Sequence, residues 1–502
     1  MKNNLEKITV NYKKNLEIRL KNDNEERTQP MFSSSNIDYT ISEKYSAISC
    51  GGIGLIDTFV KKINLPEMIN NNLHLFKRHK PYFESDHIFN IAYNIICGGT
   101  CLEDIELLRN NIHYMDALGA TRIPDPTTAG DFLRRFKEED ITTLMDIHNN
   151  ATTKVWNATL SHAEKKYGII DVDGKIQKTY GECKEGMDMS YKGIWGFSTL
   201  AVTEATTGAH LYVVNRPGNK TSHDGAVKWI DKSIDVAKNT FNTVYLRGDS
   251  DFSITGEFDR WTETGTKFIF GYDARQNLVK KADLLGENEW KSFSKPTIVR
   301  GSKRKKKQRV KENCVIKRRY KNKIQKDVQV SEFSYKPGKC EKSYRVIVCK
   351  KDLDVKEGQQ LLFEDVKYLF YITNIHDMSA EELLSFIHGR ANHENKIEQL
   401  ANGIHALKMP AAEFMANWAY MAICSLAWNI KSWLALFMPD EEKRKKIIAC
   451  EFKSFQNRLI NIPCQIIKTG RKTIYKFLNY NEWMKIFYET FLVIKKLKFS
   501  SA

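Results

Sequence analysis

The sequence lacks the short motifs that mark several large classes of soluble enzyme. None of its 10 cysteines forms a Cys-x-x-Cys pair, and no cysteine–histidine quartet has zinc-finger spacing. It has no Walker A loop, which argues against nucleotide hydrolysis, and its histidines do not follow the His-Glu-x-x-His pattern of a metalloprotease. Scattered cysteines of this kind favour reduced thiols in the cytoplasm over a disulfide-rich secreted scaffold.

The sequence also lacks internal repeats, an N-terminal secretion signal and a long uncharged apolar run. Its N-terminus is polar and charged, unlike the apolar segment of a signal peptide. The most apolar stretch, residues 414–438, contains Asn417, Asn429 and Lys431, each of which is costly inside a lipid bilayer. This stretch therefore predicts one or two buried helices rather than a membrane span, and we expect no membrane partner.

What the sequence has in excess is positive charge. Lysine and arginine total 78 against 61 aspartates and glutamates, which gives a formal net charge of +17. Such an excess usually indicates an anionic partner, nucleic acid before a membrane surface. The charge is clustered, most densely at residues 302–309, which favours nucleic acid over the alternative of many solvated lysine-rich faces. With 42% hydrophobic residues, the 502-residue chain can form a sizeable core in roughly two to four domains.

The order of helical and strand-like segments predicts a mixed α/β protein. Residues 50–155 have helical spacing. From residue 167 the pattern predicts three strands, a helix, a strand, a helix and a strand, at 167–172, 198–203, 211–215, 224–240, 244–246, 252–261 and 267–272. Periodicity alone supports a mixed α/β domain, and this element order is that of a ribonuclease-H-like core. Further strands are predicted at 328–333, 344–349 and 367–373.

We therefore expect a ribonuclease-H-like catalytic core that is interrupted by a β-rich insertion and flanked by helical N- and C-terminal regions. The six predicted segments are a polar, flexible tail at 1–30, a helical DNA-binding region at 31–160, the first part of the core at 161–280, a basic β-rich insertion at 281–360, the second part of the core at 361–412 and a helical, basic region at 413–502.

Two aspartates stand where a metal-dependent nuclease core needs them. Asp173 and Asp249 each follow an apolar run, and each is expected to close a strand before a turn. Carboxylates at the ends of adjacent strands, joined by one from a helix, can hold two Mg²⁺ ions, because carboxylate oxygens suit that hard cation. Asp171 and Asp251 are acidic neighbours two residues away that would share a face on extended backbone. For any single aspartate, turn chemistry is the commoner explanation.

The third carboxylate is expected from a later helix. Ser379 opens this helix with Glu382 in a capping box, and the helical pattern continues to about residue 402. One face of it would carry Phe386, Arg390, Glu394 and Glu398. Glu394 is the expected ligand, and Glu398, one turn later, is the competing one. Arg390 either forms an exposed ion pair within the helix or lies near a DNA phosphate.

The basic run supplies the other expected DNA contacts, which are Lys303, Arg304, Lys305, Lys306 and Lys307. The alternatives are a solvated loop and a localisation-like tract. If the run lies along DNA, each phosphate that it neutralises would steepen the salt dependence of binding. Four aromatic residues lie near this segment, and one of them could stack on an unpaired base, although most are expected in the core: Trp290, Tyr320, Tyr368 and Phe370.

These residues together resemble a known family. The segments Asp-Val-Asp-Gly-Lys at 171–175, Arg-Gly-Asp-Ser-Asp-Phe at 247–252 and Gly-Arg-Ala-Asn-His-Glu-Asn at 389–395 are similar to motifs of bacterial transposases of the insertion-sequence-1380 group, within the insertion-sequence-4-like DDE set. Similar segments lie at 125–132, 179–186, 191–196 and 215–219. The chain departs from the signature of the wider set at Ile387 and Ala401, where that set has tyrosine and lysine, so that Lys396 or Lys408 could contact DNA instead.

The resemblance implies a function and a role for each residue. Asp173, Asp249 and Glu394 would form the catalytic triad and hold two Mg²⁺ ions, with Mn²⁺ as a substitute. Arg390 and the lysines of the insertion would position the DNA strand. Members of this family are DNA transposases that bind terminal inverted repeats, cut at the element ends and join the 3′-hydroxyls to target DNA. We accordingly expect double-stranded DNA as partner, a homodimer in the synaptic complex, and a location in the bacterial cytoplasm at the nucleoid.

Two other hypotheses stay open from the sequence. One is an inactive relative that holds DNA ends without cutting them, which manganese-dependent nicking would exclude. The other is a ribonuclease-H-like nuclease that cuts DNA but does not join ends, which a strand-transfer assay would separate from a transposase.

Overall fold

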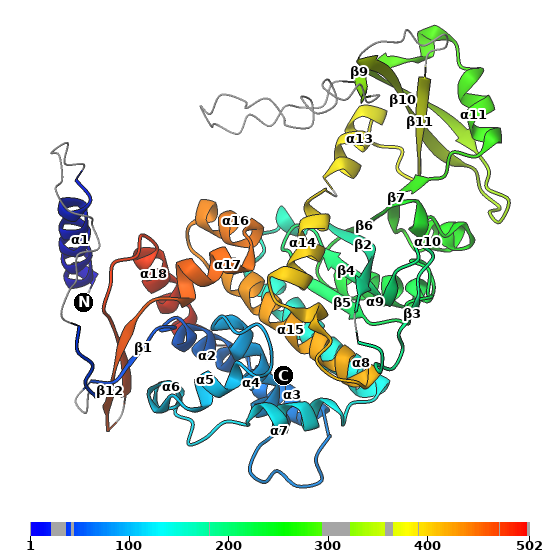
Figure 1. Ribbon diagram of the computed structural model, residues 1–502. Helices are drawn as coiled ribbons and strands as arrows, with labels where there is room; N and C mark the ends of the chain where they lie inside the picture. Colours follow the sequence, from blue (N-terminus) through cyan, green and yellow to red (C-terminus); the bar gives the residue numbers. More distant parts are fainter. Residues whose placement is uncertain are drawn as a thin grey trace.

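The protein is described here by a computed structural model (Figure 1). It describes residues 2–21, 37–41, 45–179, 181–293, 322–356, 365–389, 391–470 and 472–498. Within these ranges only the backbone is described for residues 2–9, 322–327, 351–356, 365–367 and 391–395.

A ten-stranded mixed sheet lies at the centre of the fold. Its strands follow the order β3-β4-β2-β6-β7-β11-β10-β9-β8, and β5 pairs with β4 beside this path. The strands are β2 (Tyr167–Lys178), β3 (Asp188–Met189), β4 (Trp195–Glu204), β5 (His210–Val214), β6 (Thr243–Gly248), β7 (Lys267–Tyr272), β8 (Lys291–Ser292), β9 (Asn322–Tyr335), β10 (Tyr344–Lys356) and β11 (Asp365–Thr373).

The first half of the sheet has the predicted element order. β4 pairs antiparallel with both β2 and β5, whereas β6 pairs parallel with both β2 and β7. Parallel neighbours need a long connection, and here the connections contain α9 (Ala226–Lys238) and α10 (Phe258–Glu263). The predicted order of three strands, helix, strand, helix and strand is confirmed, with the two-residue strand β3 as an addition.

The second half of the sheet continues from the first without a break. β11 pairs antiparallel with β7 on one side and with β10 on the other, and β10 pairs with β9. The strands predicted at 328–333, 344–349 and 367–373 are confirmed, and each is longer than predicted. In Figure 1 the strands β9, β10 and β11 form a leaf at the upper right, with α11 (Gln276–Asp283) and α13 (Ala380–His388) beside it.

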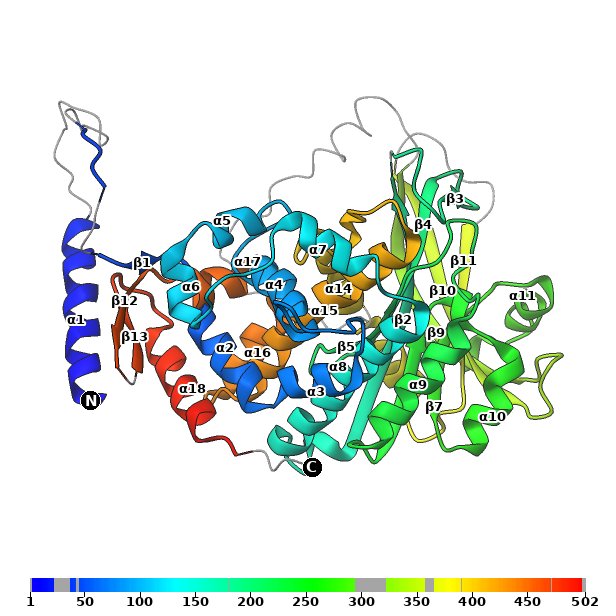
Figure 2. The same ribbon diagram turned by 90° about the horizontal axis from the view of Figure 1, so that it is seen from below.

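The predicted helical N-terminal region is confirmed. Its helices gather around the long helix α15 (Phe414–Leu436), as Figure 2 shows. They are α2 (Ile53–Lys62), α3 (Leu65–Asn72), α4 (Glu84–Ile96), α5 (Ile105–Arg109), α6 (Ile112–Leu118), α7 (Pro126–Leu133) and α8 (Glu138–Thr159). α15 is one continuous helix, and nearly all of its residues are buried, as expected for the most apolar stretch of the sequence. Among the described residues, no helix is long and apolar enough to cross a membrane.

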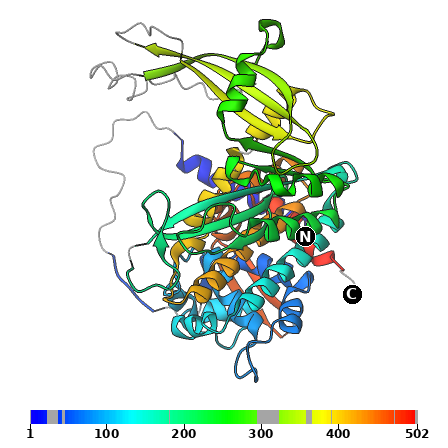
Figure 3. The same cartoon turned by 90° about the vertical axis from the view of Figure 1, so that its right-hand side faces the viewer.

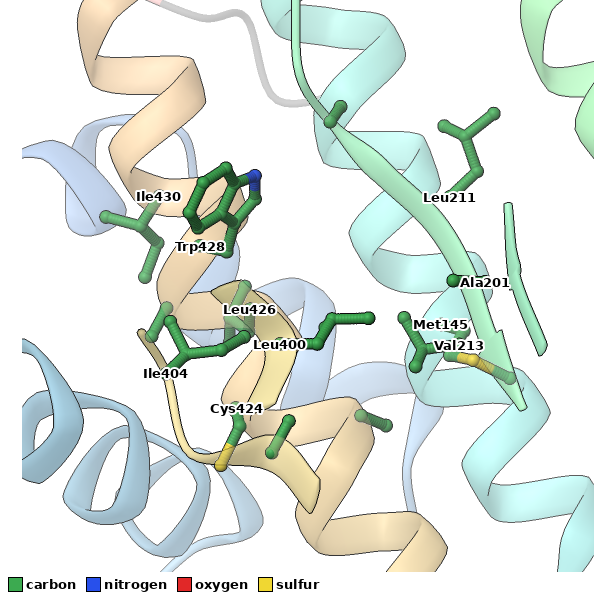
Figure 4. Packing of buried hydrophobic residues seen from close by; sticks show 14 of the residues in the cluster. Met145, Ala201, Leu211, Val213, Leu400, Ile404, Cys424, Leu426, Trp428 and Ile430 are labelled. Atoms are coloured by element: carbon green, nitrogen blue, oxygen red, sulfur yellow. The ribbon is translucent and has the colours of Figure 1, made fainter. Parts of the chain in front are cut away.

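One core joins these helices to the sheet. Ala201, Leu211 and Val213 of β4 and β5 face Met145 of α8 and Leu400 of α14 (Ala391–Asn402) across a buried apolar cluster (Figure 4). The side chains of α15 fill the space between α14 and the helices of the N-terminal region. The core therefore holds α14, the helix that carries Glu394, against the first half of the sheet.

Both ends of the chain differ from the prediction. Residues 2–19 form helix α1 (Lys2–Arg19), where a flexible tail was expected. The C-terminal region was expected to be helical, but β12 (Cys464–Thr469) and β13 (Lys472–Phe477) form a hairpin there and pair with β1 (Ala47–Ile48). The strand that completes this small sheet comes from the opposite end of the chain, so no local pattern predicts it.

The remaining C-terminal elements are helical, and α18 lies beside the small sheet in Figures 1 and 2. They are α16 (Glu441–Ala449), α17 (Phe452–Phe455), a π-helical turn (Gln456–Ile460) and α18 (Met484–Lys496). Figure 3 shows the leaf of β9 to β11 above the rest of the molecule, with the helical regions below it.

Candidate active site

Asp173 lies on β2, and Asp249 directly follows β6, the strand that pairs parallel with β2. The register of these strands aligns Ile170 with Leu246 and Asp171 with Arg247. Continued by two residues, this register would bring Asp173 opposite Asp249, and both side chains are half-buried. The two apolar runs that were predicted as strands are therefore adjacent in the sheet.

Only one of the two aspartates closes its strand. β6 ends at Gly248, immediately before Asp249, but β2 continues past Asp173 to Lys178. The additional residues of β2 pair with β4, in a register that continues to Lys178 and Gly196. The prediction that Asp173 ends a strand is therefore wrong, because the antiparallel partner extends β2 beyond the end of β6.

Backbone amides orient both carboxylates. An oxygen of Asp173 accepts a hydrogen bond from the amide of Gly174 at 2.8 Å. An oxygen of Asp249 accepts one from the amide of Asp251 at 3.0 Å, at the start of a short 3₁₀ turn. A Cβ added at Gly248 would lie 3.0 Å from Phe252 and from Phe270, so glycine allows this turn to pack closely against the end of β6.

The carboxylate of Asp173 lies on the sheet face that α14 covers. Residues directly opposite each other on neighbouring strands share a face, and Asp173 is opposite Ala201 of β4. Asp171, two residues before Asp173 on the same strand, also shares this face, and its charge acts on Lys396 of α14. The aspartate and the helix that carries Glu394 are therefore on the same side of the sheet.

Asp171, two residues before Asp173, forms a buried ion pair with Arg247. It is 1% exposed, and its two oxygens accept hydrogen bonds from Nε and Nη2 of Arg247 at 2.7 and 2.8 Å. Arg247 also donates from Nη1 to the carbonyl of Phe386 at 2.6 Å, and its guanidinium lies over the Phe386 ring. Asp171 thus neutralises a buried arginine and ties β2 and β6 to the end of α13.

Lys396 of α14 forms hydrogen bonds at the carboxyl end of β4. Lys396 Nζ donates to the carbonyl of Ala205 at 2.9 Å and to that of Glu204 at 3.3 Å. Burial lowers the pKa of Lys396, and the negative charges of Asp171 and Glu204 oppose that shift. Lys396, named from the sequence as an alternative DNA contact, is therefore engaged inside the protein. Its position brings α14 within reach of the strand aspartates.

The helix expected from Ser379 to residue 402 is two helices. Ser379 forms the predicted capping box with Glu382, but α13 ends at His388 and α14 begins at Ala391. The prediction of a single helix to residue 402 is therefore wrong, because α13 ends at His388. Glu398, the competing ligand, is exposed on α14.

Several predicted site residues cannot be placed by their side chains. The backbone of Glu394 lies in the first half of α14, two residues before Lys396, but its side chain lies outside the described atoms. The predicted DNA contacts Arg390, Lys303, Arg304, Lys305, Lys306 and Lys307 lie outside the described residues, as does Tyr320.

A cavity of about 490 Å³ adjoins Asp249. Its walls come from the ends of β6 and β7, from β11 and from the end of α13, and they include Tyr272, Tyr368, Phe370 and His388. Tyr368 also stacks on Trp290, with ring centroids 6.2 Å apart. Two of the aromatic residues singled out from the sequence therefore line a space beside Asp249, and a third supports one of them.

The described part of the site supplies two of the three donors that the expected metal centre needs. Among the described residues, no group of three His, Cys, Asp or Glu side chains is arranged to hold a metal ion. Asp173 and Asp249 offer the carboxylate oxygens that Mg²⁺ prefers. The chemistry of this pair fits the expected metal, with the third donor expected from Glu394.

The sequence matches the family model described as "Transposase DDE domain group 1" over residues 44–499. The chain belongs to the DDE transposase family. No curated protein matches the sequence of this family member. Among solved structures, the chain is similar to the piggyBac transposase in a cryo-EM synaptic complex with hairpin DNA. The two are 11% identical, and the similarity covers 82% of this chain and 80% of that chain with a TM-score of 0.34.

The sequence analysis did not identify Arg247, which links β2 and β6 to the end of α13 in this DDE transposase family member. Arg247 is the only charged residue in the run 244–248, and a charged residue in an otherwise apolar strand usually needs a buried partner. That signal could have identified Arg247 as half of an ion pair. The partner, Asp171, could not be chosen from the sequence, because the pairing depends on the register of two strands.

Proposed function

We propose that this protein is a DNA transposase of the insertion-sequence-1380 group, which cuts DNA at the ends of an insertion sequence and joins them to a target. The parallel pairing of β2, which contains Asp173, with β6, which Asp249 directly follows, carries the proposal. The order β5-β4-β2-β6-β7, antiparallel and then parallel, supports a ribonuclease-H-like core. Membership of the DDE transposase family supports transposition as the activity.

The proposed catalytic residues are Asp173, Asp249 and Glu394, which would together hold Mg²⁺, or Mn²⁺ in its place. A divalent cation bound there would lower the pKa of water and neutralise charge on the leaving oxygen of a phosphodiester. The amides of Gly174 and Asp251 hold the two strand carboxylates in a set orientation. This preorganisation places the oxygens before DNA binds, so the cost of ordering them is not added to the reaction barrier.

The proposed DNA contacts come from two segments of the sequence. Arg390 is four residues before Glu394. Lys303, Arg304, Lys305, Lys306 and Lys307 lie in the sequence between β8 and β9. We propose that both groups hold the DNA backbone, on the support of their positive charge. The resemblance to transposases supports a homodimer in the synaptic complex and a place at the bacterial nucleoid.

The decisive experiment is cleavage of a labelled duplex that carries the DNA flanking this gene, with Mg²⁺ or Mn²⁺. We expect metal-dependent cuts at the element ends by the natural protein and a loss of cutting of at least a hundredfold in Asp249→Asn. Asp251→Asn is the matched control, because Asp251 is exposed, contributes its backbone amide to the site and undergoes the same chemical change. Equal activity in the two variants would refute the role of Asp249.

The same assay separates the two alternatives. Binding of the duplex without cuts by the natural protein, in either metal, would indicate an inactive protein that holds DNA ends. Cuts without joined products, when a target duplex is present, would indicate a nuclease rather than a transposase.

A further inference from the structure

The basic helix α16 divides its charges between two kinds of contact. Arg444 forms an ion pair with Glu164 at 2.6 Å, and Lys445 forms one with Glu441 at 2.6 Å. Lys443 and Lys446, on either side of them, form no ion pair with any described residue. The helix thus carries two neutralised cations and two that are left uncompensated.

The uncompensated lysines converge on a tryptophan together with an arginine from another segment. Lys443 Nζ lies 4.8 Å from the ring centroid of Trp483, Lys446 Nζ 5.7 Å and Arg458 Cζ 5.2 Å. Arg458 comes from the π-helical turn, and Trp483 immediately precedes α18. We call Lys443, Lys446, Arg458 and Trp483 the Trp483 cluster.

The charges of the Trp483 cluster are not balanced within the described protein. The carboxylate of Glu482 accepts a hydrogen bond from the Trp483 indole at 2.9 Å, and among the described residues it forms no ion pair with the three cations. Nη1 of Arg458 is buried without a hydrogen-bond partner among the described residues. The ring attracts each cation, but the three like charges repel one another, so an anion bound among them would relieve that repulsion.

We propose that the Trp483 cluster binds a phosphate of the DNA backbone outside the active site, an inference that rests on the proposed function. Ammonium and guanidinium groups are donors only, so their natural ligand is an oxyanion with acceptors only. Trp483 is 2% exposed, and a base therefore cannot stack on its ring. The site holds the backbone and does not discriminate between sequences.

The Trp483 cluster and Asp173 lie towards different parts of β2. The ion pair between Arg444 and Glu164 places α16 beside the residues that precede β2. Asp173 lies six residues beyond Tyr167, the first residue of that strand, which is about 20 Å at about 3.3 Å per residue. A phosphate contact near the start of β2 anchors the duplex without touching the phosphodiester that reacts.

The test measures duplex binding against salt concentration by fluorescence anisotropy, with full-length Lys443→Gln, Lys446→Gln and Lys445→Gln variants. We expect each of the first two to reduce the slope of log K against log salt by up to about 0.9 per lost phosphate contact. The reduction should be equal on the flanking duplex and on an unrelated one. Lys445→Gln, which removes the same charge from the same helix, should keep the slope of the natural protein because Lys445 is paired and exposed.

Each outcome has one meaning. A Lys443→Gln/Lys446→Gln double variant with the unchanged natural slope, or one that loses binding to anionic lipid vesicles but not to DNA, would overturn the inference. Failure of the natural protein to cut would refute the proposed function, whereas the salt slopes would still report on the cluster.

Discussion

Removing Arg247 should be among the most damaging single changes in the sheet. Its guanidinium makes hydrogen bonds of 2.7 and 2.8 Å to Asp171 and one of 2.6 Å to the carbonyl of Phe386. Arg247→Met would leave the carboxylate of Asp171, 1% exposed, without its counter-charge. Breaking a buried ion pair by removing one partner costs about 3–5 kcal/mol, because an uncompensated charge is left behind.

The expected fall in melting temperature follows from the size of the chain. Unfolding entropy is about 2.1 cal/mol/K per residue, which for 502 residues is on the order of 1 kcal/mol per kelvin. A loss of about 3–5 kcal/mol therefore lowers Tm by about 3–5 °C if the chain unfolds as one unit. Thermal unfolding followed by circular dichroism would measure this shift.

A double-mutant cycle tests the reasoning. Asp171→Leu/Arg247→Met leaves neither member of the pair without its partner, so it should be less destabilised than either single variant, apart from about 1 kcal/mol for the hydrogen bond to Phe386. Glu441→Gln, which breaks the exposed pair with Lys445, is the control and should change stability by no more than about 0.5 kcal/mol. If the double variant lost the sum of the two single effects, the residues would not be coupled and the reasoning would be refuted.

Two further predictions concern a buried lysine, Lys431, and the glycine that precedes Asp249. Burial lowers the pKa of Lys431 to about 8 from 10.5, so the unfolded chain binds the proton more tightly, and stability should rise between pH 8 and pH 10.5. The Tm of the natural protein minus the Tm of Lys431→Met should therefore increase as pH rises through this window. A difference that stays constant would contradict the assignment. Gly248→Ala should cost about 1–3 kcal/mol, because its Cβ would lie 3.0 Å from Phe252 and Phe270. Gly256→Ala, where a Cβ meets nothing within 4 Å, should change little in the same urea unfolding measurement.

The strands of the first half of the sheet were predictable because each is a short apolar run bounded by turn residues. Residues 170–172 and 244–248, which precede Asp173 and Asp249, are buried, as in the strands of a parallel sheet covered on both faces. The buried helix α15 was predictable for a similar reason, since a long apolar stretch that contains Asn417, Asn429 and Lys431 is expected in a core rather than a bilayer. Local composition was therefore sufficient to predict where these elements lie in the sequence.

Other features depend on contacts that composition does not contain. The end of β2 depends on β4, and the hairpin β12–β13 is completed by β1, more than 400 residues away in the sequence. α13 ends two residues after Phe386, whose carbonyl accepts a hydrogen bond from Arg247, and Arg247 is itself oriented by Asp171. Strand register and side-chain contacts over long separations set these details, so periodicity could not predict them.

The continuity of the sheet through β7 and β11 gives the molecule a mechanical property. β11 leads through residues 374–379 into α13, so the start of this helix is attached to the leaf formed by β9, β10 and β11. Its end is attached to the other half of the sheet, because Arg247 bonds both the carbonyl of Phe386 and Asp171 of β2. α13 therefore braces the leaf against the strand that carries Asp171 and Asp173.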